Sequence, residues 1–113
     1  MGTGYIPGRG DLVWLNFVPQ AGHEQSGKRP ALVISSGKYN AKVGLALFMP
    51  ITSKQKGYPF EVVLPDNLPI SGVILSDQVK SLDWDARSAE YICSVPESCV
   101  QEALNKLLVL IKQ

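Results

Sequence analysis

Apolar residues in this chain occur in short runs that are separated by glycine, proline and other turn-forming residues. In residues 12–17, apolar side chains occupy both alternating sets of positions, which is typical of a strand buried on both faces. Residues 60–64 alternate instead, with Phe60, Val62 and Leu64 on one face. Runs of this length at short intervals indicate strands and turns. The predicted strands are residues 12–17, 31–35, 44–49, 60–64, 72–75, 78–82 and 90–95.

The carboxy-terminal segment has a different period. Its apolar residues recur at steps of three and four, which gives a helix one apolar stripe. Ser94 or Ser98 is expected to cap the start of this helix, and Pro96 suits its first turn. The stripe consists of Val100, Ala103, Leu104, Leu107, Leu108 and Ile111.

Two segments between the strands lack both patterns. Residues 18–28 contain Pro19, Gly22 and Gly27 among polar residues, so they are predicted to form a long loop. Loops of this length in compact domains are usually lids or binding loops. Residues 36–40 are expected to form a turn or a single helical turn, and Pro50 is expected to end the strand that follows.

Short strands followed by one helix predict a mainly β fold, a small antiparallel barrel with a carboxy-terminal helix. The 113 residues suffice for one hydrophobic core, so residues 1–113 are expected to form a single domain. A chain with 45% hydrophobic and 19% charged residues is globular rather than disordered. No apolar run is long enough to cross a bilayer, and the amino terminus lacks the features of a secretion signal, so a cytoplasmic location is expected.

The residue types that build metal sites and disulfides are scarce. Cys93 and Cys99 lack the spacing of a metal or redox pair and are expected to be reduced and mostly buried. His23 is the single histidine and cannot build a zinc site alone, so no metal or other cofactor is expected. Trp14 and Trp84 are interpreted as core or interface residues.

The net charge of +1 conceals an uneven distribution. Residues 25–60 contain basic residues and no acidic one, whereas acidic residues predominate from residue 61 onward. This segregation indicates one positive face, the electrostatic footprint of a polyanion binder. A solvated face without a partner, or a groove for an acidic protein segment, would carry the same charges. The basic residues are Lys28, Arg29, Lys38, Lys42, Lys54 and Lys56.

Candidate reactive residues lie within this basic region. Glu24 and Arg29 flank the second half of the long loop, and Thr52 follows a predicted strand. An arginine offers a rigid fork of donors that matches two phosphate oxygens. Each residue also has an ordinary reading, as a surface ion pair or a turn hydrogen bond. The residues alone therefore predict a basic small barrel that binds a polyanion.

A series of short motifs resembles the MazF/PemK family, the mRNA interferase toxins of toxin–antitoxin systems. The motifs extend from residue 10 to about residue 81, and the helical tail is compatible with the family. The combination of several motifs at matching separations makes the resemblance specific. The motifs are GDLVW at 10–14, GHEQSGKRPALV at 22–33, YN at 39–40, PITS at 50–53, KGYPFEV at 56–62 and GVILSDQVKS at 72–81.

The resemblance implies an SH3-like barrel of the CcdB/PemK-like type that forms a homodimer and cuts single-stranded mRNA at short motifs, thereby inhibiting translation. An ACA-containing site is the candidate motif. Cleavage would need no metal, because the ribose 2′-hydroxyl attacks the phosphate and leaves 2′,3′-cyclic phosphate and 5′-hydroxyl ends. The implied protein partner is an acidic antitoxin of the MazE/PemI type, bound across the dimer in the positive groove. No membrane is involved.

The resemblance carries over Arg29 and Thr52 as catalytic, with Glu24 in a supporting or proton-transfer role. An arginine stays protonated in proteins, so Arg29 is expected to stabilise the charged phosphorane, whereas Glu24, the only carboxylate between residues 12 and 60, is the candidate base. Thr52 can donate a hydrogen bond to a phosphate oxygen or hold Arg29. Expected phosphate contacts are Lys28, Lys54, Lys56 and Lys80, and expected base-edge contacts are Asn40, Ser53 and Gln78.

Two other functions remain open for such a fold. The gyrase-poisoning CcdB toxins share it, but their poisoning depends on a tryptophan near the extreme carboxy terminus, and this chain ends in Ile-Lys-Gln. The second alternative is a non-catalytic barrel that binds RNA or a peptide. Such a module would make no use of Glu24, Arg29 and Thr52 together.

Overall fold

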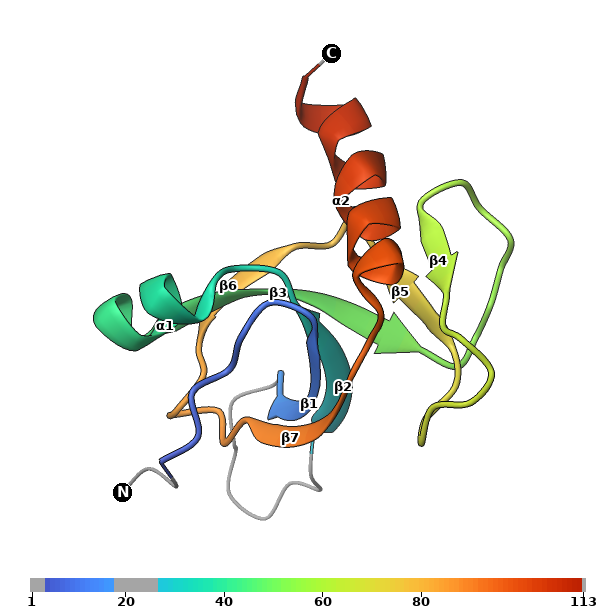
Figure 1. Cartoon of the computed structure of the whole chain (residues 1–113). Helices are drawn as coiled ribbons and strands as arrows, with labels where there is room; N and C mark the ends of the chain where they lie inside the picture. Colours follow the sequence, from blue (N-terminus) through green and yellow to red (C-terminus); the bar gives the residue numbers. More distant parts are fainter. Residues whose placement is uncertain (1–3, 18–26, 113) are drawn as a thin grey trace.

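A computed structural model of the chain describes residues 4–17 and 27–112. The strands form one seven-stranded antiparallel sheet in the order β4-β5-β3-β2-β1-β7, with β6 paired to β3 (Figure 1). The predicted mainly β fold with a carboxy-terminal helix is confirmed, although the barrel is open because β4 and β7 are not neighbours. The elements are β1 (Asp11–Asn16), β2 (Lys28–Val33), α1 (Gly37–Val43), β3 (Leu45–Thr52), β4 (Glu61–Val63), β5 (Val73–Leu75), β6 (Lys80–Asp83), β7 (Glu90–Ser94) and α2 (Glu97–Ile111).

Strand β3 is the centre of the sheet. One of its edges pairs with β2, and the other pairs first with β6 and then with β5. The prediction that Pro50 ends this strand is wrong, because β3 continues to Thr52. On the edge away from β2, the pairing with β6 stops at Phe48 and the pairing with β5 starts at Ile51. Pro50 lies in this gap in the ladder, where a residue without an N–H group is tolerated.

The chain packs around two hydrophobic clusters on opposite faces of the sheet. In β1, Leu12 belongs to the first cluster, whereas Val13 and Leu15 belong to the second. All three are completely buried, which confirms the prediction that β1 is covered on both faces. Buried residues of α2 complete the first cluster, so the helix covers that face of the sheet. Those helix residues are Cys99, Val100 and Ala103.

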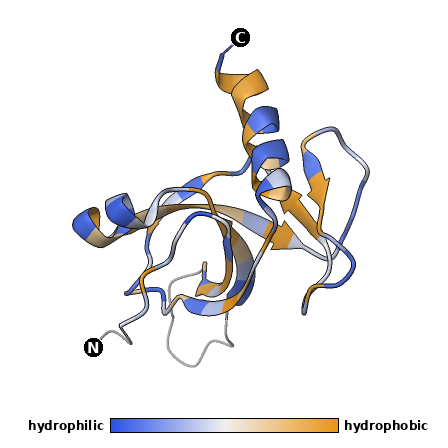
Figure 2. Ribbon diagram, viewed as in Figure 1, coloured by the Kyte–Doolittle hydropathy of each residue, from blue (hydrophilic) through white to orange (hydrophobic). Residues whose placement is uncertain are grey.

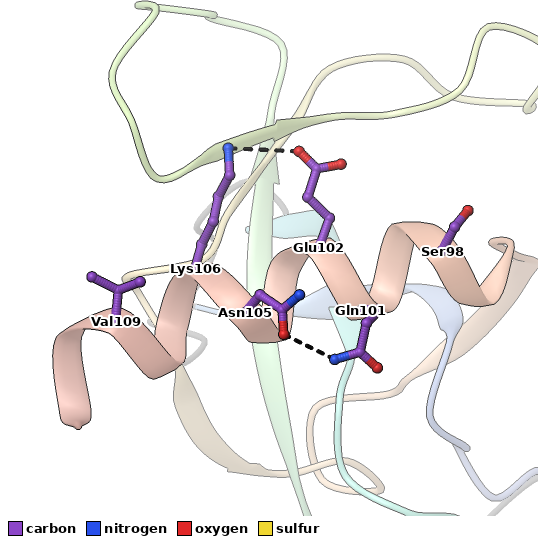
Figure 3. A pocket seen from close by; sticks show the side chains of 6 residues that line it. All are labelled: Ser98, Gln101, Glu102, Asn105, Lys106 and Val109. Carbon is purple, nitrogen blue, oxygen red and sulfur yellow. Dashed lines mark hydrogen bonds and ion pairs between the residues drawn. The ribbon is translucent and has the colours of Figure 1, made fainter.

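Helix α2 begins without a side-chain cap. Pro96 occupies the N-cap position, so the predicted capping by Ser94 or Ser98 is wrong. The Ser94 hydroxyl instead donates to Asp11 Oδ1 at 3.2 Å. The outer face of the helix is polar, with hydrogen bonds and ion pairs between neighbouring turns such as Glu102 and Lys106 (Figure 3). Neither described helix is long and apolar enough to cross a membrane.

Helix α1 is longer than the predicted single turn. The Ser36 hydroxyl caps its start by accepting a hydrogen bond from the Tyr39 amide, and Gly44 ends it with a φ of 82°. Glycine adopts this left-handed conformation without a steric penalty. Because Gly44 is the helix cap, β3 begins at Leu45 rather than at the predicted residue 44.

The two cysteines are free thiols, as predicted. Cys99 is buried in the first hydrophobic cluster, and Cys93 is half-buried. Burial raises the pKa of both thiols, so they remain protonated at neutral pH. Neither has the character of a nucleophile.

Candidate functional site

A pocket of about 590 Å³ lies where the ends of β2 and β3 meet the loop between β4 and β5. Its described lining combines cationic and hydroxyl-bearing side chains with apolar ones. No described residue in this lining is a carboxylate. The lining residues are Trp14, Lys28, Arg29, Pro30, Ile51, Thr52, Ser53, Lys54, Pro69, Ile70 and Ser71.

The strand register explains why Arg29 and Thr52 meet in this pocket. Strands β2 and β3 are antiparallel, with Ala31 opposite Pro50. Arg29 lies two residues before Ala31 and Thr52 lies two residues after Pro50, so both lie just beyond the last paired rung, at the same end of the two strands. The sheet therefore brings together two residues that are distant in the sequence.

The Thr52 hydroxyl is positioned by its own backbone. Its Oγ1 accepts a hydrogen bond from the Lys54 amide at 3.1 Å, in a turn at the end of β3. A hydroxyl that accepts one bond in this way still has its O–H to donate. That donor is available for an oxygen atom of a ligand in the pocket.

Gly72 lies against the backbone of Thr52. Its φ of 136° lies in the region that side-chain-bearing residues rarely adopt, and a Cβ atom there would lie 2.5 Å from the Thr52 carbonyl oxygen. The absence of a side chain therefore allows β5 to approach β3 closely, with Val73 opposite Thr52. Residues 69–71, directly before Gly72, form one wall of the pocket.

Arg29 is an exposed cation of the pocket. Within residues 4–17 and 27–112, its guanidinium makes no hydrogen bond or ion pair, which leaves a full set of donors for a ligand. Lys28 differs, because its ammonium lies 3.0 Å from Glu90 Oε1. Lys54 adds a further exposed positive charge. The described lining thus favours an anionic ligand with oxygen acceptors.

The predicted phosphate and base contacts do not all lie in the pocket. Lys28, Ser53 and Lys54 line it, together with the two catalytic candidates. Lys80 pairs with Phe48 in β3, four residues from Thr52, so it lies farther along the sheet. Gln78 is exposed in the turn after β5, and Lys56 is exposed in the loop before β4.

The loop that carries Lys56 is held by a buried carboxylate. Glu61 is nearly buried, and its two oxygens accept hydrogen bonds from the Lys56 and Gly57 amides, both at 2.9 Å. The Tyr58 hydroxyl donates to Asp77 at 2.7 Å, and this bond raises the pKa of Tyr58. Both contacts tie the loop to the body of the sheet, and Tyr58 remains a neutral phenol at physiological pH.

Asn40 does not fit the predicted contact with a base edge. It is the buried residue of α1, and its side chain is completely buried. Its Oδ1 accepts from the Ser35 hydroxyl at 2.6 Å, and its Nδ2 donates to the Pro7 and Ser35 carbonyl oxygens at 2.7 and 3.1 Å. With all these groups engaged inside the protein, Asn40 is a structural residue and is removed from the substrate-binding set.

The predicted base Glu24 lies outside the described residues, as do His23 and most of the predicted loop. Among the described residues, no three His, Cys, Asp or Glu side chains are grouped as metal ligands would be.

The prediction of Trp14 as a core residue is wrong, whereas the alternative of an interface residue stays a prediction. It lines the pocket, and neither hydrophobic cluster of described residues includes it. Trp84, by contrast, packs against the second cluster and donates its Nε1–H to the Asn40 carbonyl at 3.0 Å. Trp14 is flanked in the sequence by the core residues Val13 and Leu15, which made a core position the natural expectation for it.

Residues 8–111 match the family of PemK-like, MazF-like toxins of type II toxin–antitoxin systems. The chain belongs to this family. The endoribonuclease toxin MazF of Escherichia coli strain K12 is 48% identical to this MazF/PemK family member over 107 residues, which cover 95% of this chain and 96% of the relative. The endoribonuclease toxin ChpB of the same strain is 36% identical, and the alignment covers 92% of this chain and 93% of ChpB.

The fold of this MazF/PemK chain also matches solved structures. A MazE–MazF crystal structure from Deinococcus radiodurans has a TM-score of 0.90 and 52% identity, with coverage of 96% of this chain and 98% of that one. The family and fold implied by the sequence motifs are thereby confirmed. All described residues that line the pocket fall inside the matched region.

Proposed function

We propose that this chain is an endoribonuclease toxin that cuts single-stranded mRNA in the pocket at the ends of β2 and β3, and so inhibits translation. The observation that carries the proposal is that Arg29 and Thr52 line one cationic pocket, in a chain whose relatives MazF and ChpB are named endoribonuclease toxins. The pocket takes a phosphate between the guanidinium and the hydroxyl.

The proposed reaction is internal attack by the ribose 2′-hydroxyl on the neighbouring phosphorus. The new O–P bond closes a 2′,3′-cyclic phosphate, and the bond to the 5′ oxygen breaks. Arg29 donates hydrogen bonds to the non-bridging oxygens as negative charge develops on the phosphorane, and Thr52 adds a further donor. Lys54 holds the flanking phosphate, and the Ser53 hydroxyl faces a base edge.

Proton transfer completes this mechanism. A base takes the proton of the 2′-hydroxyl, and an acid protonates the departing 5′ oxygen. The described pocket lining supplies cations and hydroxyls but no carboxylate. Glu24 remains the proposed base for this reason. No metal takes part in the proposed steps.

The second partner in the proposal is an antitoxin. Crystal structures of MazE–MazF pairs have the same fold as this chain. A cationic pocket attracts an acidic peptide by the same electrostatics that attract RNA. We therefore propose that an acidic segment of a MazE/PemI-like antitoxin covers Arg29 and excludes RNA. The chain acts in the cytoplasm, where its mRNA substrate is found.

The test of this function is to incubate the purified chain with a long single-stranded RNA in EDTA and to map the ends. Cuts at a recurring short motif, with 5′-hydroxyl and 2′,3′-cyclic phosphate ends, are the expected result. RNA binding without cleavage would favour the non-catalytic barrel. Inhibition of DNA supercoiling by gyrase, with intact RNA, would favour the gyrase poison. Adding the antitoxin before the RNA is expected to stop the cleavage.

The proposal includes a homodimer, which the end of α2 supports. The end of α2 is hydrophobic (Figure 2). Its consecutive exposed residues, with exposed fractions from 41% to 66%, are Leu108, Val109, Leu110 and Ile111. Burying such a stretch against a second copy would remove apolar surface from water.

Sedimentation of the wild-type chain is expected to give twice the chain mass, and the double variant Leu108→Glu/Ile111→Glu is expected to give a monomer. Gln101→Glu, a charged control on the polar face of α2, should leave the dimer intact. A wild-type monomer, or a double variant that still dimerises, would remove the homodimer from the proposal.

A further inference from the structure

We propose that Trp14 and the loop residues Pro69 and Ile70 form a subsite that holds the unpaired base next to the cleaved phosphate. The inference rests on the proposed function and extends it from the reacting phosphate to the recognition of the neighbouring nucleotide. It assigns a binding role to a tryptophan that the sequence pattern places with the core.

Trp14 is unusual for an apolar residue of β1. Its neighbours Val13 and Leu15 are completely buried in the second cluster, whereas Trp14 is half-buried and belongs to neither cluster. Its indole Nε1–H has no acceptor within the described chain. A large aromatic surface left outside the core, with an open donor, is suited to a ligand that is both flat and polar.

The pocket has two chemically different sides. Trp14, Pro30, Ile51, Pro69 and Ile70 give it an apolar lining, and the remaining described residues bring cations and hydroxyls. A nucleotide has the same division, with a flat base at one end and a charged phosphate at the other. The volume of about 590 Å³ lies within the usual range for a small-molecule site, so the base and its phosphate can enter together.

Trp14 and Arg29 lie one rung apart on neighbouring strands and line the same pocket. Trp14 pairs with Pro30, and the next rung pairs Leu15 with Arg29. Successive rungs are about 3.3 Å apart along a strand. Successive side chains alternate between the two faces of a sheet, so it is the shared pocket at the strand ends, which both residues line, that relates the indole to the guanidinium. A base against Trp14 therefore belongs to a nucleotide near the phosphate that Arg29 binds.

This arrangement also explains a preference for unpaired RNA. A base can lie against an indole only when it has left its own stack, which single strands allow and duplexes resist. Stacking on an aromatic ring accepts any base, so the selective contacts must come from hydrogen-bonding groups. Ser53 and Ser71, which line the same pocket, have hydroxyls that can bond to a base edge.

Fluorescence can detect the contact directly, because the chain has two tryptophans. The variant Trp84→Phe leaves Trp14 as the sole indole. The probe is an oligonucleotide that spans a mapped cut, with 2′-deoxyribose throughout to prevent cleavage. Binding is expected to quench Trp14 emission, and an abasic site beside the scissile phosphate is expected to abolish the quenching. Unchanged emission, while the anisotropy of a labelled oligonucleotide shows binding, would overturn the subsite.

Kinetics provide a second readout. Trp14→Ala is expected to raise KM for RNA about ten- to a hundredfold with a smaller effect on kcat, because one base–aromatic stack is lost. Trp14→Phe keeps an aromatic face and should remain close to wild type, and Trp84→Phe is the matched control at the core tryptophan. Circular dichroism checks that each variant is folded. An unchanged KM in folded Trp14→Ala would overturn the subsite.

The same experiments separate the subsite from the proposed function. If the wild-type chain cuts RNA and Trp14→Ala has an unchanged KM, the function stands and the subsite falls. If the wild-type chain cuts no RNA, the function falls. Quenching of Trp14 by an ACA-containing deoxy-oligonucleotide would then still support a base-binding site.

Discussion

Arg29→Ala is expected to abolish RNA cleavage while the protein remains folded. Removing one preorganised donor from a developing oxyanion typically lowers the rate about a hundred- to a thousandfold, and Arg29 supplies several such donors. The fold does not depend on this side chain, because it is exposed and has no partner in the described part of the chain. Single-turnover cleavage of a mapped RNA, together with a thermal melt, measures both parts of the prediction.

Two variants control this experiment. Arg29→Lys keeps the positive charge but loses the planar fork, so its rate should lie between those of the wild type and the alanine variant. Lys38→Ala removes an exposed cation on α1, outside the pocket, and should keep full activity. Near-normal turnover of folded Arg29→Ala would refute the assignment of Arg29 as the group that stabilises the phosphorane.

Asn40→Ala is expected to destabilise the protein by about 3 kcal/mol, because each buried polar group left without a partner costs about 1–3 kcal/mol. The groups affected are the Ser35 hydroxyl and the Pro7 and Ser35 carbonyl oxygens. The hydroxyl oxygen of Ser35 also accepts a hydrogen bond from the Leu47 amide at 2.9 Å. The asparagine therefore links α1 and β3 to the amino-terminal segment.

Urea unfolding measures this loss, and cleavage per folded molecule tests whether Asn40 also contacts RNA. The activity of the folded fraction is expected to be normal. Asn105→Ala is the matched control, because Asn105 is exposed and its Oδ1 accepts a hydrogen bond only from the neighbouring turn of α2, among the contacts described. A variant of normal stability with weakened RNA binding would restore Asn40 to the substrate-binding set.

The strands and the final helix could be predicted because their signals are local. In β1, apolar residues occupy both alternating sets of positions, because the strand is covered on both faces. In α2, apolar residues recur at steps of three and four, because one face of the helix is buried. The limits of α1 and β3 were harder to predict. They depend on the Gly44 cap and on the change of partner strand at Pro50, and the second of these arises from long-range pairing.

The candidate site also divides into features that local sequence predicts and features that depend on long-range contacts. Arg29 and Thr52 could be named from their motifs, but their meeting depends on the β2–β3 register. Asn40 and Trp14 were misread because composition and spacing do not reveal what a side chain touches. The partner Pro7 lies far from Asn40 in the sequence, and Trp14 shares its pocket with residues 69–71, which lie far from it in the sequence.

Gly72, which has no side chain, separates the position of Thr52 from the identity of the neighbouring pocket residues 69–71. Because Gly72 approaches Thr52 through main-chain atoms, substitutions at residues 69–71 are expected to leave the Thr52 hydroxyl in place. Under the proposed function, exchanges at these three positions are therefore expected to change which nucleotide is preferred and to leave the cleavage step unaffected.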